Sequence, residues 1–231
     1  MIKIILAVLL FTSVAHGKLT TSFYHQSVYL EKYTDLINQG QFKVLKSHEH
    51  YDLYLGLNYD FDNKSDKTVT YTDQQINPLI GMQSKVYWYS KLFSEYRGVY
   101  RQGEFFDDRT KTTNDLRVGV LGYNKINYDK AFQEFYYVIF YSSLYNDQVI
   151  LQGWHKHGLM LNGFDLFNEL YVDSFDITKS RQFTTDLRPG VRFSKRFSQS
   201  SIQLLFQRLI PIDQSGRSNE SRATLVYYIE Q

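Results

Sequence analysis

Hydrophobic and polar positions alternate most clearly over residues 50–62, HYDLYLGLNYDFD. The odd positions from Tyr51 to Phe61 are all apolar or aromatic, whereas the even positions from His50 to Asp62 are almost all polar or small. Successive side chains of a β-strand point to opposite faces, so this pattern predicts a strand with one apolar and one polar face. The length of the apolar face, with aromatic residues towards its ends, is typical of a transmembrane strand in an outer-membrane barrel.

The same alternation recurs along the rest of the chain. It predicts further strands at 68–72, 80–88, 92–101, 115–123, 130–143, 148–157, 164–176, 183–196, 202–210 and 222–230. Residues 130–143 are apolar and aromatic on both faces, so their register is left open. Pro78 is expected at a strand start rather than a strand centre, because proline cannot donate a hydrogen bond within a sheet.

The links between these strands differ in length. Short links at 89–91 and 198–200 interleave with longer charged links at 102–113, 177–185 and 213–221. Outer-membrane barrels show this asymmetry, with short periplasmic turns and longer outer loops. At about 18 residues per strand and link, the chain after residue 17 holds about 12 strands, with ten as the nearest alternative even count. We therefore predict an all-β fold, an antiparallel transmembrane β-barrel over residues 48–231.

Residues 18–47 are the least regular part of the chain. Residues 27–40 favour a short helix with Tyr29, Tyr33, Leu36 and Ile37 on one side, ended by Gly40. The alternative is a strand with Val28 and Leu30 on one face. As a helix, this segment would pack at the periplasmic mouth or inside the barrel.

Alternation alone does not say which face is outside, and a soluble barrel is the competing interpretation. The polar face carries glycines and large tyrosines, where the exterior of a soluble barrel is normally rich in Lys and Glu. Its charges have both signs on neighbouring strands, and such charges suit an interior in which each needs a partner. The membrane barrel is therefore the favoured interpretation.

The first seventeen residues, MIKIILAVLLFTSVAHG, have the pattern of a secretory signal peptide. Lys3 gives the positive start, an apolar run follows, and Ala15 and Gly17 are small residues before a cleavage site at Lys18. Export of the remaining chain predicts the outer membrane of a Gram-negative bacterium as its location. Outer-membrane lipid and the barrel assembly machinery are the expected partners, although the chain ends Glu230–Gln231 instead of on an aromatic residue.

Composition supports a large exported barrel. There is no cysteine, and a barrel closed by its own hydrogen bonds needs no disulfide. Aromatic residues make up 17% of the chain, with 20 Tyr against 2 Trp, which fits aromatic girdles at the membrane interfaces. The net charge of +2 carries no nucleic-acid-binding footprint, so no nucleic-acid partner is predicted.

Four local strings resemble a known family: NPLIGMQSKVY (77–87), LFSEYRGVYR (92–101), FNELYVDS (167–174) and RPGVRFSK (188–195). They are similar to the C-terminal outer-membrane barrel of bacterial exopolysaccharide secretion proteins, of the phage adsorption protein A type and its relative in cellulose synthase complexes. The resemblance covers roughly residue 48 to the end and implies a channel for polysaccharide. It implies that Glu95, Arg97, Glu169 and Arg188 face the lumen. A helical-repeat region precedes the barrel in that family, and here a separate periplasmic helical-repeat partner is expected to supply it.

The charged residues of the polar faces are the candidate pore residues, because rings of charge set solute selectivity in channels. They are Lys85, Glu95, Arg97, Arg101, Asp115, Arg117, Glu169, Asp173, Arg188 and Arg192. The competing interpretation is structural, since in a small barrel the same charges pair and fill the interior. Tyrosines on these faces, Tyr54, Tyr87, Tyr123 and Tyr171, favour a saccharide path slightly.

Two histidine motifs suggest other chemistry. His48 and His50 would share a strand face as metal ligands, but no third ligand is evident and a solvated pair is favoured. His155 or His157, with Ser142, Ser143 and Asp147 near in sequence, would be needed for a hydrolase. We predict a channel for polysaccharide or small polar solutes that is not an enzyme and has no cofactor or metal. The alternative is a non-conducting adhesin, phage receptor or structural barrel, and a hydrolase is the third choice.

Overall fold

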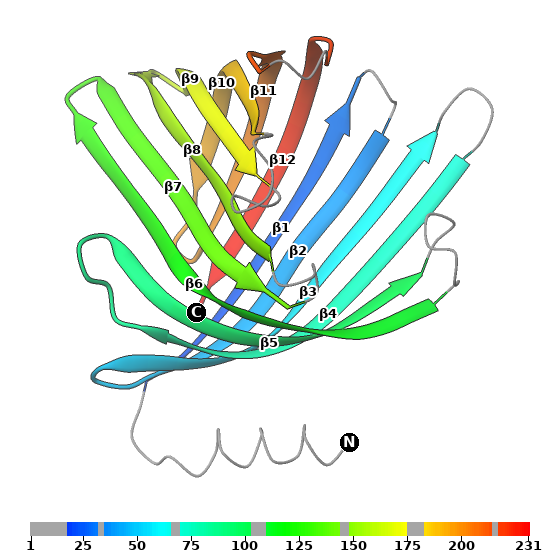
Figure 1. Ribbon diagram of the computed structural model, residues 1–231. Helices are drawn as coiled ribbons and strands as arrows, with labels where there is room; N and C mark the ends of the chain where they lie inside the picture. The colour runs from blue at the N-terminus through cyan, green and yellow to red at the C-terminus, as the bar shows by residue number, and fades with distance from the viewer. Residues whose placement is uncertain are drawn as a thin grey trace.

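The computed structural model describes residues 18–31, 35–65, 70–102, 110–143, 148–174, 183–213 and 217–231. These residues form twelve antiparallel strands in a closed barrel, in which β1 pairs with β12 and every other strand pairs with its sequence neighbours (Figure 1). The predicted closed barrel of 12 strands is confirmed, and the predicted signal peptide lies outside the described residues. The strands are β1 (Lys18–Leu30), β2 (Asp35–Ser47), β3 (Tyr51–Ser65), β4 (Thr70–Ser84), β5 (Ser90–Gln102), β6 (Thr110–Tyr128), β7 (Ala131–Ser142), β8 (Gln148–Leu161), β9 (Phe164–Ser174), β10 (Thr184–Arg196), β11 (Ser200–Pro211) and β12 (Glu220–Glu230).

The helix expected within residues 27–40 is wrong, and the barrel begins at Lys18 rather than at residue 48. Residues 27–30 belong to β1 and residues 35–40 to β2, and the two strands pair with each other along their whole length. β1 also pairs with β12, so it closes the sheet and leaves no unpaired edge. Closing the sheet depends on contacts between residues far apart in sequence. The local spacing of apolar residues therefore did not reveal that residues 27–30 and 35–40 belong to strands. No helix within the described ranges is long and apolar enough to cross a membrane.

Pro78 lies inside a strand, contrary to the expectation that it starts one. The segments expected as two strands, 68–72 and 80–88, are replaced by the single strand β4. Pairing of β4 with β3 is continuous through Leu57 and Pro78, whereas its pairing with β5 passes from Ile76–Tyr100 directly to Leu79–Arg97. Proline has no N–H to donate, so the interruption falls on the side of the strand that faces β5.

Polar side chains face the inside of the barrel and apolar side chains face the outside, as the alternation predicts. In β3, Asp52 and Tyr54 are 5% and 3% exposed inside the barrel, whereas Leu57 on the outer face is 41% exposed. Most of the large apolar side chains with high exposure lie on the outer face, among them Phe42, Met82, Leu92, Leu116, Val118, Phe206 and Leu225. An apolar exterior around a polar interior is the pattern of a membrane barrel.

The links define two different rims. The links that follow β2, β4, β6, β8 and β10 lie at one end of the barrel, which we call the short-link rim. They are 48–50, 85–89, 129–130, 162–163 and 197–199. We call the opposite end the long-link rim, because the two longest links, residues 175–183 and 212–219, join strands there. One of the two shortest links, 162–163, contains Gly163 at a φ of +92°, which only glycine adopts readily. Both chain ends of the barrel lie at the short-link rim, where Thr21 and Gln231 exchange backbone hydrogen bonds of 2.8 and 2.9 Å.

Candidate functional site

The barrel interior contains several groups of buried charges, and the first lies at the short-link rim. Asp52 on β3 accepts hydrogen bonds from Ser47 Oγ at 2.9 Å and from Gln83 Nε2 at 3.0 Å. It also forms an ion pair with Lys85, which follows β4. Lys85 was predicted to line a pore, and the structure gives it a carboxylate partner at the rim.

The second group lies on β5 and β6. Arg97 pairs with Glu95, and Arg117 Nε lies 2.5 Å from Asp115 Oδ2. In each pair the residues are two positions apart and therefore share the inner face of one strand. Asp115 is fully buried and also accepts a hydrogen bond from Ser142 Oγ at 2.7 Å. These charges are paired within the wall, as the structural interpretation of the polar face predicts.

The third group is built around Arg192 on β10. Its guanidinium donates to Glu134 Oε2 at 3.0 Å and to Asp165 Oδ2 at 2.9 Å, and it lies over the ring of Phe132. Tyr123 Oη donates to the other oxygen of Glu134 at 2.9 Å. Arg192 thus connects carboxylates from β7 and β9 across the inner surface of the barrel.

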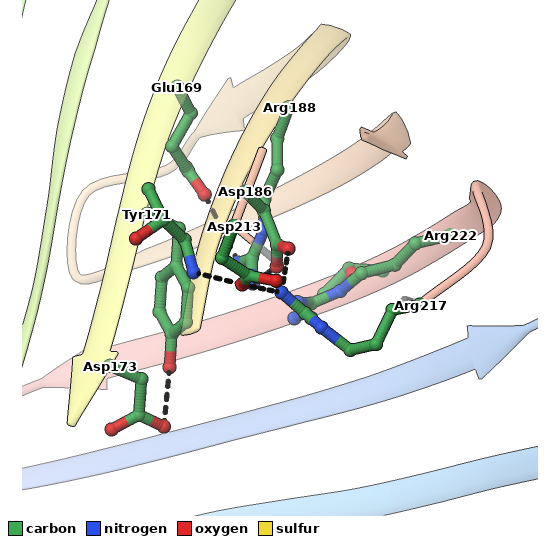
Figure 2. Close-up of polar contacts among 10 residues, drawn as sticks. Glu169, Tyr171, Asp173, Asp186, Arg188, Asp213, Arg217 and Arg222 are labelled. Atoms are coloured by element: carbon green, nitrogen blue, oxygen red, sulfur yellow. Dashed lines mark hydrogen bonds and ion pairs between the residues drawn. The ribbon is translucent and has the colours of Figure 1, made fainter. Parts of the chain in front are cut away.

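The fourth group lies towards the long-link rim (Figure 2). Arg188 donates to Glu169 at 3.4 Å and to Asp186 at 2.9 Å, and its guanidinium lies over the ring of Tyr171. Lys156 Nζ lies 3.0 Å from the second oxygen of Glu169. Strands β8, β9 and β10 therefore contribute to one connected set of charges.

Arg217 connects the link between β11 and β12 to this group. Its Nη2 atom lies 2.8 Å from Asp186 Oδ1 and 2.5 Å from Asp213 Oδ2. Burial opposes the charge on Arg217, but the hydrogen bonds that it donates to Asp213 and Asp186 outweigh this effect and raise the pKa of the guanidinium above its ordinary value. Arg217 thereby contacts the inner face of β10 at Asp186.

Arg222 on β12 differs from the other buried cations. Its Nε donates to Thr224 Oγ1 at 3.0 Å, and among the described residues no carboxylate lies within ion-pair distance of it. It faces the barrel interior together with Arg188, and Figure 2 draws both residues with the Asp186–Arg217 contact. An arginine without a carboxylate partner in a polar cavity is available to an anionic or polar solute.

Two adjoining cavities occupy one side of the interior. The larger, about 1020 Å³, is lined by β1, β2 and β6 to β12, including Tyr24, Tyr136, Trp154, Tyr171, Arg188 and Arg222. The smaller, about 660 Å³, lies at the short-link rim beside residues 198–201. Both are lined by Tyr123, Glu134, Arg192, Ser201, Gln203 and Tyr228, which we call the junction. The two cavities therefore share their lining at the junction, and the lining of the larger one extends to Leu30 and Glu220 at the long-link rim.

Another part of the interior, next to the larger cavity, is packed. Val138, Phe140 and Ile150 form a buried apolar cluster, with Phe93 and Leu121 against it. Arg97 and Arg117 do not line either of the two cavities. The predicted alternatives, a hollow lumen and a filled barrel, therefore describe different parts of the same interior.

The structure places the ten predicted pore residues on the inner face or, for Lys85, at the rim. Glu169, Arg188 and Arg192 line the cavities, Arg101 donates to Gln75, and Asp173 accepts from Tyr171. Asp52, Glu134, Lys156, Asp186 and Arg222 were missed. Asp186 is two residues before Arg188 and so lies on the same strand face, and alternation could have identified it as an inward-facing charge. Glu134 could not be assigned to a face because its strand is apolar on both sides.

Two other sequence-based expectations need correction. Tyr87 is 76% exposed in a rim link and does not face the lumen. Ser142 points inward to Asp115, whereas His155 is exposed on the outer face, so the two cannot form a nucleophile–base pair. Asp147 lies outside the described residues. Among the described residues, no three His, Cys, Asp or Glu side chains are grouped so as to hold a metal ion.

Comparison with known proteins identifies the architecture. No protein-family model matches the chain, and no curated protein matches it in sequence. Solved structures do match. CdiB from Acinetobacter baumannii has a TM-score of 0.52 at 8% identity, over 94% of this chain and 60% of that chain. The beta domain of the Bordetella autotransporter BrkA has a TM-score of 0.52 at 10% identity, over 93% of this chain and 99% of that domain. An outer membrane channel from Pseudomonas putida F1 has a TM-score of 0.50 at 12% identity, over 95% and 97%. The chain therefore has the fold of outer-membrane β-barrels and spans 60% of the length of the Acinetobacter protein.

Proposed function

We propose that this barrel spans the outer membrane of a Gram-negative bacterium and conducts polar solutes along the two joined cavities. The observation that carries the proposal is the junction, where the cavities from the two rims share six polar or aromatic residues. The apolar outer face supports placement in lipid, and the short-link rim is expected to face the periplasm. A similar fold in a known outer membrane channel is consistent with this role.

Saccharides are the proposed solute class. Tyr24, Tyr136, Trp154 and Tyr171 present aromatic surfaces to the larger cavity, and Arg188 and Arg222 lie among them. Amphipathic rings combined with a few placed polar groups suit a flat, hydroxylated solute. The resemblance to exopolysaccharide secretion barrels points to the same class, either as a polymer handed over by a periplasmic helical-repeat partner or as short polar fragments.

A non-conducting barrel, used as an adhesin, phage receptor or structural protein, is the second candidate. The observation that favours it is the packed side of the interior, where Glu95, Arg97, Asp115 and Arg117 are paired and apolar side chains fill the remaining space. The two candidates differ in one measurable property, which is current through the purified protein.

Membrane placement predicts heat-modifiable migration. Folded protein loaded on a gel without boiling should migrate differently from boiled protein, because a closed barrel with all of its strands paired resists the detergent at room temperature. The protein should sediment with the outer membrane and stay there after a carbonate wash. Recovery of the folded chain in the soluble periplasmic fraction would contradict this placement.

Conduction predicts discrete current steps when the folded protein is added to a planar bilayer. Arg222→Gln should lower the preference for anions by about fivefold, since one unit charge about 4 Å away contributes about 1 kcal/mol in a water-like medium. Arg208→Gln is the matched control, because Arg208 is exposed on the other face of β11. Absence of current steps from correctly folded protein would favour the non-conducting barrel instead.

A further inference from the structure

A polar cluster interrupts the apolar outer face at β1, β2 and β3. His25 and Ser27 lie on the outer face of β1, Asn38 on β2 and Tyr59 on β3. Their surroundings are apolar, because Phe42 and Leu225, on the neighbouring strands, are each 45% exposed on the same face. Polar and ionisable groups on a lipid-facing surface are costly and are kept where they have a function.

These four side chains form one hydrogen-bonded chain. His25 Nε2 lies 3.0 Å from Ser27 Oγ, and the Ser27 hydroxyl donates a hydrogen bond of 2.8 Å to Asn38 Oδ1. The other ring nitrogen, His25 Nδ1, lies 2.5 Å from Tyr59 Oη. A hydroxyl within hydrogen-bond reach of a base that is itself oriented by a third group is the arrangement of an activated nucleophile.

Gly40 makes this arrangement possible. It lies between His25 and Tyr59 in the strand register, since it pairs with His25 on one side and with Tyr59 on the other. A Cβ at Gly40 would overlap the tyrosine ring, so the absence of a side chain lets the ring cross β2 and reach the histidine. The His25 and Tyr59 rings are nearly parallel, with centroids 6.0 Å apart. Tyr59 can thus orient the histidine from two strands away.

The cluster lies near the long-link rim. Ser27 is three residues before the end of β1 at Leu30. At a rise of about 3.3 Å per residue and a tilt of about 45°, this places Ser27 roughly 7 Å inside that rim. In the proposed orientation this depth is the boundary between headgroups and acyl chains of the outer leaflet, which is where the ester bonds of lipids lie.

We propose that His25 and Ser27 form an acyl-ester hydrolase site on the outer face of the barrel, which cleaves ester-linked acyl chains of membrane lipids. It extends the function beyond the non-enzymatic channel expected from the sequence. The inference rests on the proposed membrane placement but not on conduction, because the site and the cavities lie on opposite faces of the wall.

The reaction has two balanced halves. When His25 Nδ1–H donates to Tyr59 Oη, Nε2 is free to accept the Ser27 proton as Oγ attacks the ester carbonyl. The tetrahedral intermediate collapses, the alcohol of the lipid leaves with the proton from His25, and the acyl group stays on Ser27. Water then attacks this acyl ester and gives its proton to His25, which returns it to Ser27 Oγ as the fatty acid departs. In the structure the Ser27 hydroxyl donates to Asn38 Oδ1, so it turns to His25 Nε2 before the attack. A flip of the Asn38 amide would then let its nitrogen donate to the carbonyl oxygen that becomes negative.

The test is ester hydrolysis by the full chain folded in detergent. The probe is a phospholipid with labelled acyl chains in mixed micelles, with lipid A in a second arm to separate the two lipid sources. Wild type should release fatty acid in one arm or both, and Ser27→Ala and His25→Asn should each lower the rate by at least about 100-fold. A long-chain sulfonyl fluoride should label Ser27, as located by mass spectrometry of the digested protein.

Matched variants separate chemistry from folding. Ser94→Ala removes a serine of the outer face that has no histidine beside it, between Met82 and Val118, and should leave the rate unchanged. Tyr59→Phe and Gly40→Ala test positioning: each should lower kcat with little change in KM, and Tyr59→Phe should also alter the pH profile. Every variant should keep the conductance and heat-modifiable migration of wild type.

Two results would overturn the proposal. One is the absence of ester cleavage and of sulfonyl labelling in wild type that is correctly folded in both lipid arms. The other is a Ser27→Ala variant as active as wild type, which would leave the four side chains as a structural cluster that satisfies its own hydrogen bonds. Neither result would bear on conduction, whose own test is the planar bilayer.

Discussion

Asp115→Ala is expected to lower the free energy of unfolding by about 3–5 kcal/mol, the cost of breaking a buried ion pair by removing one partner. Asp115 is fully buried, pairs with Arg117 and accepts from Ser142. Its removal leaves the Arg117 cation on the packed side of the interior, with no carboxylate beside it on its strand. Urea unfolding of the barrel in lipid vesicles measures the change.

Two further variants give this expectation its controls. Asp173→Ala removes a carboxylate that is only partly buried and accepts a single long hydrogen bond of 3.4 Å, so its effect should stay below about 1 kcal/mol. The double variant Asp115→Ala/Arg117→Ala should recover part of the loss, because the unpaired cation is then gone. An Asp115→Ala variant as stable as wild type would mean that Arg117 finds solvent or another anion inside the barrel.

Arg192→Ala is expected to change conduction more than any other single substitution in the cavities. Arg192 lines both cavities and holds Glu134 and Asp165, so its removal widens the junction and leaves two carboxylates beside the path. Single-channel current should rise, and the cation-to-anion permeability ratio should increase by more than about fivefold, the effect of losing one unit charge at about 4 Å in water.

The control for this variant is Arg97→Ala. It also removes an inner-face arginine, but Arg97 lies on the packed side, where it pairs with Glu95 and lines neither cavity. Ion preference should stay as in wild type. An equal change in selectivity from both substitutions would place the path of the solute on the other side of the interior, through β5 and β6.

Much of this structure follows from the alternation of apolar and polar side chains at every second residue. The alternation in residues 50–62 gave the correct faces of β3, since one side of the wall contacts polar atoms and the other is apolar. The same rule placed Glu95, Asp115 and Arg188 inside. It failed at residues 27–40, where tyrosines and leucines also recur with a helical period and only pairing with β12 decides between the two structures. It also failed at Pro78, because the gap in pairing that the proline causes falls on the β5 side of β4 alone.

The candidate sites were predicted less completely than the fold. Charge pairs such as Arg192–Glu134 join strands that are far apart in sequence, so strand patterns cannot supply them. The hydrolase interpretation was attached to His155 and Ser142, which the register places on opposite faces. His25 and Ser27 stood in the irregular segment before residue 48, part of which was assigned to a helix, where residues two apart do not face each other. Once β1 is a strand, the spacing of two places both on the same face.

The pairing of β1 with β12 has a consequence for how the protein assembles. Every other pairing joins strands that are consecutive in sequence, whereas Phe23 must meet Ile229 across nearly the whole chain. Contacts of such long sequence separation form late, because the entropy of closing the loop between them is lost before the contact contributes. The hairpin-type pairings can therefore precede closure, and until then β1 and β12 present open edges that another chain could join. The rate at which this seam closes should set the time during which the nascent barrel is vulnerable to aggregation.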